Sequence, residues 1–163
     1  MKYFLFFILF LSVPLFASPQ KGEPLPLVEI DEWKSDSFRG KVNVIFYVDP
    51  DERSDNENLE VLLHEQNFLK DKLQSIAIIN MAATWLPNSL INSVLEGKKK
   101  KFANTLYVND LKKELVDKWK LKDNSYDVLI LDKKGIVVFH QSGKLKKEEM
   151  KNVVELIKEK IKE

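Results

Sequence analysis

The sequence predicts an α/β fold, a three-layer sandwich in which a central mixed sheet is flanked by helices on both faces. Two observations carry this prediction. Short apolar runs typical of buried strands alternate with segments of helical periodicity, and the last third of the chain holds a β-hairpin followed by an amphipathic helix. Such an alternation is typical of layers packed around one sheet, here closed by the hairpin and the C-terminal helix.

Residues 1–17 differ in composition from the rest of the chain. Lys2 is the only charge, an apolar run follows it, and Ala17 is a small residue suited to signal cleavage. The pattern predicts a secretory signal peptide over 1–17 and a single domain over 18–163, with no stable membrane span after cleavage. Pro14 interrupts the run, which is shorter than the roughly 18 to 20 residues of a spanning helix. An uncleaved anchor is the alternative.

The first elements of the exported chain lead into a buried strand and a helix. Residues 27–30 form a short strand candidate, and VNVIFYV at 42–48 is the β-branched and aromatic run expected of a central strand. Ser54 and Glu57 have the spacing of a capping box, which is expected to begin the first helix. The strand, turn and helix around this point carry the reactive cysteines in redox proteins of similar layout.

Strands and helices continue to alternate to the end of the chain. The closing helix is the clearest, because Met150, Val153, Val154 and Ile157 share one face. The predicted elements are a strand at 75–80, a helix at 88–96 ended by Gly97 with a solvated lysine run behind it, a strand at 104–110, a helix at 111–121, a hairpin around the DKKG turn within 127–140, and a helix from Lys146.

This layout is that of the thioredoxin fold in its longer form. GEPLPLVEI…FRGKVNVIFYV and the segment from FANTLYV to HQSGKL resemble exported thioredoxin-like and peroxiredoxin-like proteins. Within that superfamily the chain resembles the YtfJ family of exported bacterial proteins, on Asn58, the IIN ending at Asn80, Trp119 with Leu121, and VLILDKKGIVVF. The resemblance runs from Gly22 to the last helix. It implies a thioredoxin-like fold and a periplasmic location, and it brings no activity because the family has no established one.

The chain departs from redox relatives at the positions that matter most to them. It contains no cysteine, which excludes thiol–disulfide oxidoreductase and thiol peroxidase activity as well as disulfides and thiolate metal sites. The resemblance places the missing cysteines near Asp51 to Ser54 and a missing proline near Tyr126. The Asp pair that follows the equivalent of Asn80 in typical relatives is replaced by alanines in MAAT.

Composition excludes several further classes of function. The 26 basic and 25 acidic residues give a net charge of +1, which indicates no nucleic-acid partner. The five glycines are scattered, so no phosphate-cradling loop exists, and no serine lies in a G-x-S-x-G motif. His64 and His140 are too few for a metal site. We therefore expect no metal, no cofactor and no assigned catalytic residue.

The turn DPDERSDNEN has a structural and a functional interpretation. Acidic residues in the first turn of a helix offset its positive end, which explains them structurally. The functional interpretation is a recognition surface at the carboxyl ends of the strands. That surface would combine Asp51, Arg53, Trp85 and Tyr126, with Arg53 as its anchor. Trp85 could equally lie in the core.

Three hypotheses follow, in this order. The first is a non-redox binding or adaptor module of the periplasm, whose partner is an unknown periplasmic protein or small ligand; a binding protein is favoured over an enzyme. The second is a cysteine-independent enzyme that uses the Asp49 and Asp51 carboxylates, with or without a metal. The third is a peripheral membrane-surface protein that binds anionic lipid through Lys98 to Lys101.

Overall fold

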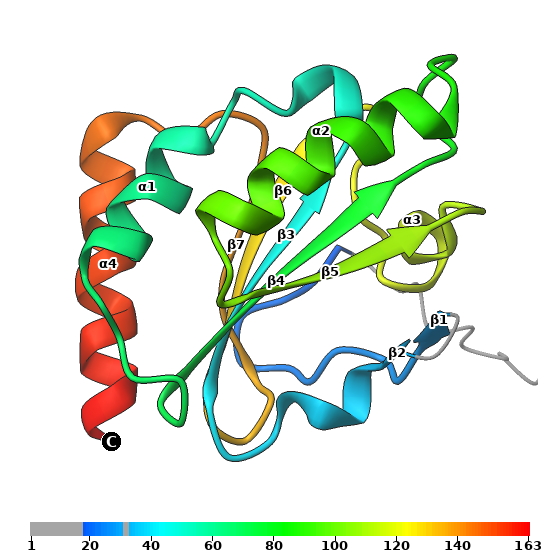
Figure 1. Ribbon diagram of the computed structural model, residues 1–163. Helices are drawn as coiled ribbons and strands as arrows, with labels where there is room; N and C mark the ends of the chain where they lie inside the picture. The colour runs from blue at the N-terminus through cyan, green and yellow to red at the C-terminus, as the bar shows by residue number, and fades with distance from the viewer. Residues whose placement is uncertain (1–17, 31–32) are drawn as a thin grey trace, which may run out of the picture.

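The computed structural model describes residues 18–30 and 33–163 (Figure 1). The predicted signal peptide at 1–17 lies outside the described residues. The strands are β1 (Glu29–Ile30), β2 (Trp33–Lys34), β3 (Val42–Val48), β4 (Leu73–Asn80), β5 (Thr105–Asp110), β6 (Tyr126–Leu131) and β7 (Val137–Ser142). The helices are α1 (Glu57–Glu65), α2 (Asn88–Lys101), α3 (Glu114–Lys118) and α4 (Lys147–Lys162), with short 3₁₀ helices η1 (Ser35–Phe38) and η2 (Pro50–Glu52).

The predicted mixed sheet is confirmed. It has five strands in the order β5-β4-β3-β6-β7, and β1 and β2 form a separate small sheet. The strands β3, β4 and β5 run parallel, whereas β6 and β7 pair antiparallel as the predicted hairpin. Every residue of the central strand β3 is buried, as its β-branched and aromatic sequence with little polarity predicted.

Helices cover both faces of the sheet, so the predicted sandwich is confirmed as well. Figure 1 shows α1, α2 and α4 on one side and α3 with β1 and β2 on the other. Successive side chains of β3 alternate between the two resulting cores: Val44 and Phe46 face the first, and Ile45 and Tyr47 face the second.

The start of α1 differs from the prediction. The helix begins at Glu57, and its N-cap is Asn56 rather than Ser54, so the predicted capping box does not form. Residues Pro50–Glu52 form η2 instead. Asn56 is fully buried because its amide serves another element: it donates to the Gly143 carbonyl at 3.1 Å and accepts from the Leu145 backbone N–H at 2.9 Å. The turn is thereby tied to the loop before α4.

The boundaries of two further helices also differ. The helix α2 continues through Gly97 to Lys101, so the lysines form its last turn and not a tail behind it. Gly97 lacks the positive φ that a helix-ending glycine adopts, and the lysine charges complement the negative helix end. The helix α3 is shorter than predicted, since the Asp110 carboxylate fixes its start.

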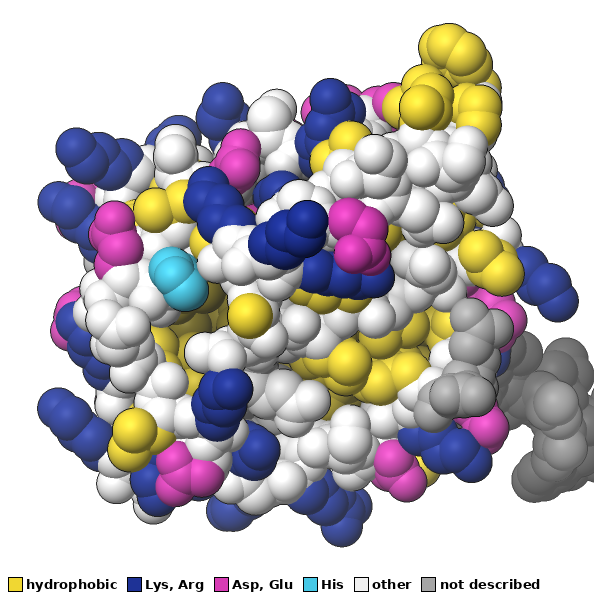
Figure 2. Space-filling view, in the orientation of Figure 1, with side chains coloured by type: hydrophobic (Ala, Val, Ile, Leu, Met, Phe, Trp, Pro, Cys, Tyr) yellow, Lys and Arg dark blue, Asp and Glu magenta, His cyan; other side chains and the backbone are white. Residues whose placement is uncertain are grey.

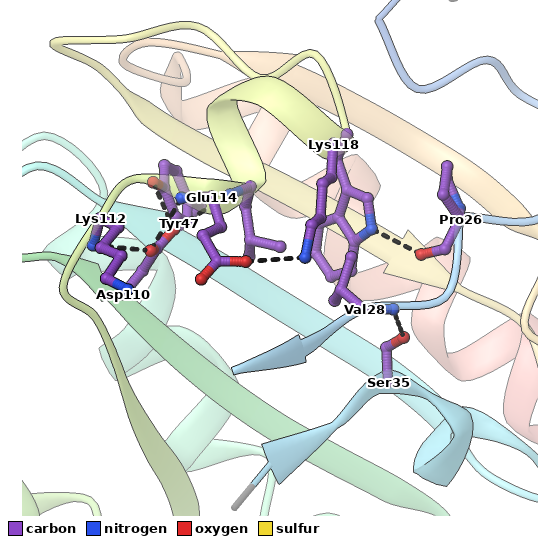
Figure 3. A network of polar contacts seen from close by, with 10 residues as sticks. Pro26, Val28, Ser35, Tyr47, Asp110, Lys112, Glu114 and Lys118 are labelled. Atoms are coloured by element: carbon purple, nitrogen blue, oxygen red, sulfur yellow. Dashed lines mark hydrogen bonds and ion pairs between the residues drawn. The ribbon is translucent and has the colours of Figure 1, made fainter. Parts of the chain in front are cut away.

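Asp110 connects the end of β5 to α3 in a buried network, which Figure 3 shows. Its carboxylate accepts from the Tyr47 hydroxyl at 3.0 Å and from the backbone N–H groups of Glu114 and Leu115 at 2.8 and 3.0 Å. Nearby, the Trp119 indole donates to the Pro26 carbonyl at 2.7 Å. The N-terminal segment is therefore fastened to α3, and this face of the sheet is closed.

Candidate functional site

The face of the sheet that carries α1 and α2 is not closed. A cavity of about 220 Å³ lies between these two helices and the strands β3, β4 and β5. Most of its wall is apolar, with Phe46, Ala77 and Ile79 on the sheet and Leu63 and Ile91 on the helices. An apolar cavity with a few convergent polar groups is the usual form of a small-molecule site.

Four polar side chains, Glu60, Lys98, Tyr107 and Tyr126, lie together at this cavity; we call them the polar cluster. Glu60 of α1 accepts from the Tyr126 hydroxyl at 2.6 Å and from the Lys98 ammonium of α2 at 2.7 Å. Glu60, Lys98 and Tyr107 line the cavity. The Glu60–Lys98 ion pair therefore joins α1 to α2 beside the apolar space.

The two tyrosines of the polar cluster stay neutral at physiological pH. Burial raises the pKa of Tyr107 to about 12, and the Glu60 charge adds to the shift. Burial likewise raises the pKa of Tyr126 well above its ordinary value, with Glu60 again contributing. Both hydroxyls consequently remain hydrogen-bond donors.

The lip of the cavity is formed by apolar side chains of α2. Leu90 and Val94 line the cavity although 56% and 50% of each is exposed, and they lie one helical turn apart on the same side of α2. Figure 2 shows hydrophobic side chains in hollows among the charged groups of this face. An accessible apolar opening of this kind permits a ligand to enter.

The structure brings some of the predicted surface residues to this cavity. Arg53 is exposed and lines it near the carboxyl end of β3, and its guanidinium donates to the Pro50 carbonyl at 2.9 Å. Asp51 is exposed close by, and its carboxylate accepts from the Thr84 hydroxyl at 3.2 Å. Thr84 belongs to the loop that carries Trp85, so the acidic turn and this loop are in contact.

Trp85 and Tyr126 have opposite environments. Trp85 is 86% exposed, which decides the question that the sequence left open. Tyr126 is fully buried against Phe46, with ring centroids 5.9 Å apart, so it does not belong to an exposed surface. Its period-2 position on β6 directs it into the core, where its hydroxyl supports Glu60.

Asp49 is the most perturbed carboxyl of the acidic turn. It is buried, its carboxylate accepts from the Asp51 backbone N–H at 2.8 Å, and its own N–H donates to the Ser125 carbonyl. Burial raises the pKa of Asp49, and the charges of Asp51 and Glu52 add to the shift. A carboxyl with a raised pKa is suited to acid–base chemistry.

The histidines do not form a metal centre with other residues. No group of three or more His, Asp or Glu side chains within residues 18–30 and 33–163 is arranged to hold a metal ion. His64 is exposed, whereas His140 Nε2 lies 2.9 Å from the buried Asp127 carboxylate. Ser142 also donates to Asp127 and not to the imidazole, so the three residues lack the serine–histidine pair of a nucleophilic enzyme.

The lysine run is largely engaged in ion pairs. Lys98 pairs with Glu60, Lys99 with Glu96 at 2.9 Å, and Lys101 with Glu57 at 3.8 Å.

Among the described helices, none is both long and apolar enough to cross a bilayer.

Sequence reasoning missed Glu60 and Tyr107 as site residues, and it considered Lys98 only as part of a lipid-binding lysine run. Glu60 and Lys98 are 38 residues apart and meet only through the packing of α1 on α2. One signal was present in the sequence: apolar residues at 90, 91, 94 and 95 cover a wider arc of α2 than a single buried stripe requires.

Residues 21–160 match a protein family described as "Bacterial protein of unknown function (YtfJ_HI0045)". The uncharacterized protein YtfJ of Escherichia coli (strain K12) is 26% identical over 134 residues, which cover 80% of this chain and 72% of that protein.

Solved structures with a similar fold are thioredoxin-like proteins. A thioredoxin-like protein from Parabacteroides distasonis has a TM-score of 0.60 at 14% identity, and the match covers 86% of this chain and 96% of that one. The thioredoxin domain of a thiol-disulfide oxidoreductase from Bacteroides vulgatus has a TM-score of 0.60 at 17% identity, with 85% and 98% covered. A thiol peroxidase from Chromobacterium violaceum has a TM-score of 0.59 at 18% identity, with 88% of both chains covered. These likenesses show the fold alone.

Proposed function

The chain belongs to the YtfJ family of bacterial proteins of unknown function, and from that premise we propose that it is a non-redox binding protein of the periplasm. Its site is the cavity between α1, α2 and the sheet, and its ligand is a small molecule with an apolar body. The absence of cysteine from the whole sequence excludes the thiol chemistry of its structural neighbours.

The observation that carries this proposal is the accessible apolar cavity itself. The apolar wall of an accessible cavity is exposed to water, and a ligand that covers this wall removes apolar surface from water. A space of about 220 Å³ with a half-exposed apolar lip is therefore a cost to the free protein that a ligand would offset.

The proposal is tested with decanol as an uncharged apolar probe, followed by amide NMR. Saturable shifts are expected at amides of α1, α2 and β4 and not at those of β1, β2 or α3, which lie on the opposite face. No saturable shift up to the solubility limit of decanol, or uniform shifts over both faces, would overturn it.

A second candidate function is favoured by the raised pKa of Asp49, which suits a cysteine-independent enzyme that uses a carboxyl group. It predicts turnover of a chromogenic ester, phosphate or glycoside that is lost in Asp49→Asn and retained in the variant Glu52→Gln, which changes an exposed acid of the same turn. Equal turnover in both variants, or none in the unmodified protein, would remove its support.

A further inference from the structure

We propose that the cavity binds a single-chain amphiphile with a carboxylate head, such as a medium-chain fatty acid; this inference rests on the binding function proposed above. The shape of the cavity defines the body of the ligand, and the polar cluster defines its head.

The lining of the cavity extends along β4. Its lining residues on β4 run from Leu73 to Ile79, a span of roughly 20 Å at about 3.3 Å per residue. Its volume of about 220 Å³ exceeds the roughly 150 Å³ cavity that holds benzene and falls below the roughly 300 to 1,000 Å³ of pockets for drug-sized ligands. A cavity of this volume, with a lining of this extent, can hold one extended medium-length alkyl chain.

Both carboxylate oxygens of Glu60 already accept a hydrogen bond. One of its carboxylate oxygens accepts from Tyr126 and the other from Lys98. A cationic head at Glu60 would share the carboxylate with Lys98 and would lie beside its ammonium group, where the two like charges repel. The arrangement therefore disfavours a positively charged ligand.

Donors, by contrast, are available to an incoming acceptor. The Lys98 ammonium has three donors, and in the described part of the chain its carboxylate partners are Glu60 at 2.7 Å and Glu57 at the longer distance of 3.9 Å. The neutral Tyr107 hydroxyl can donate from β5, on the sheet side of the cavity. Two donors that border an apolar channel match a carboxylate at the end of an alkyl chain.

The charge of the lining supports an anionic head as well. Arg53, Lys70 and Lys98 line the cavity, against Glu60 as the acidic lining residue. The net positive charge at the opening would attract an anion and hold it where the lysine can donate.

The test compares three probes with the same chain: decanoate, decanol and decyltrimethylammonium, each titrated below its micelle-forming concentration and followed by amide NMR. Decanoate is expected to bind about tenfold or more tightly than decanol, since it adds a charge-assisted hydrogen bond. Lys98→Gln, which can still donate to Glu60, is expected to remove that preference by lowering decanoate affinity about tenfold.

Two further variants make the result specific. Lys100→Gln makes the same charge change on α2 outside the cavity lining and is expected to keep the preference for decanoate. Tyr107→Phe keeps the Lys98–Glu60 pair and the ring, so it tests the head site even where Lys98→Gln does not fold. It is expected to lower decanoate affinity by about threefold to tenfold.

The possible outcomes separate the two proposals. Equal affinity for decanoate and decanol, or a preference for the cationic probe, would overturn the carboxylate assignment and leave the binding function intact. Failure of all three probes to bind would overturn both. A preference for decanoate that Lys98→Gln and Tyr107→Phe both reduce, and Lys100→Gln does not, is the supporting result.

Discussion

Ala77→Val is expected to stabilise the protein and to weaken ligand binding at the same time. Ala77 lies on β4, is almost fully buried and lines the cavity. Valine adds two methyl-sized groups to a β-strand, where its branched side chain is favoured. If both occupy the empty space, burial at about 0.8 kcal/mol per group raises the free energy of unfolding by about 1.5 kcal/mol.

Urea unfolding followed by tryptophan fluorescence measures this change. The midpoint is expected to rise with an unchanged m-value, and a change of this size raises the Tm by about 3 to 6 °C for a domain of this length. Decanol affinity is expected to fall, because the added groups occupy the volume that the alkyl chain would take.

The matched control is Ile78→Val on the opposite face of the same strand. Ile78 is fully buried in the closed core, so losing one methyl group costs about 1 kcal/mol and leaves decanol affinity unchanged. The reasoning is refuted if Ala77→Val destabilises the protein by more than about 1 kcal/mol, as overpacking of a filled core would. The cavity would then be no binding space.

Three further predictions concern the buried polar groups. Asp110→Ala removes the carboxylate that accepts from the Tyr47 hydroxyl and from backbone N–H groups of α3; urea unfolding should show a loss of about 3 kcal/mol, and a loss below about 1 kcal/mol would contradict that role. The pKa values of Tyr47, Tyr107 and Tyr126 are all raised above 10.0, chiefly by burial. Above pH 10 the unfolded state therefore loses tyrosine protons that the folded state keeps, and the unfolding free energy falls by about 1.4 kcal/mol per pH unit for each tyrosine. Urea midpoints that stay level above pH 10 would argue against the raised tyrosine pKa values. Burial raises the pKa of Asp49, so its ionised form opposes folding once the pH passes from 3.8 through the raised value. Asp49→Asn, whose amide oxygen can still accept from the Asp51 N–H, should raise the urea midpoint at pH 7, and a lower midpoint would show that the charge is needed.

Local patterns determined the secondary structure well where one periodicity dominated. The run at Val42–Val48, which is apolar apart from Asn43, predicted a strand buried on both faces, and the stripe containing Met150 and Ile157 predicted a helix with one buried side. Helix ends were less predictable. The Ser54 capping box failed because Asn56, fixed by contacts 87 and 89 residues away, sets the start of α1 instead.

The candidate surface illustrates the same limit at the level of function. The sequence placed the acidic turn and the Trp85 loop at the carboxyl ends of neighbouring strands, and the structure shows them in contact through Asp51 and Thr84. It also assigned Tyr126 to that surface, but the pairing of β6 with β3 turns this side chain into the core. A shift of one residue along a strand decides which face a side chain occupies.

The sequence by itself determined that this protein carries out no thiol chemistry, because chemistry of that kind needs an atom that the chain does not contain. It also determined the order of strands and helices, since hydrophobic periodicity is a local property. The cavity and its polar cluster were decided only by the tertiary structure. Glu60 meets Lys98 across 38 residues and Tyr126 across 66, and an unfilled space arises from how helices pack on a sheet, which no local pattern records.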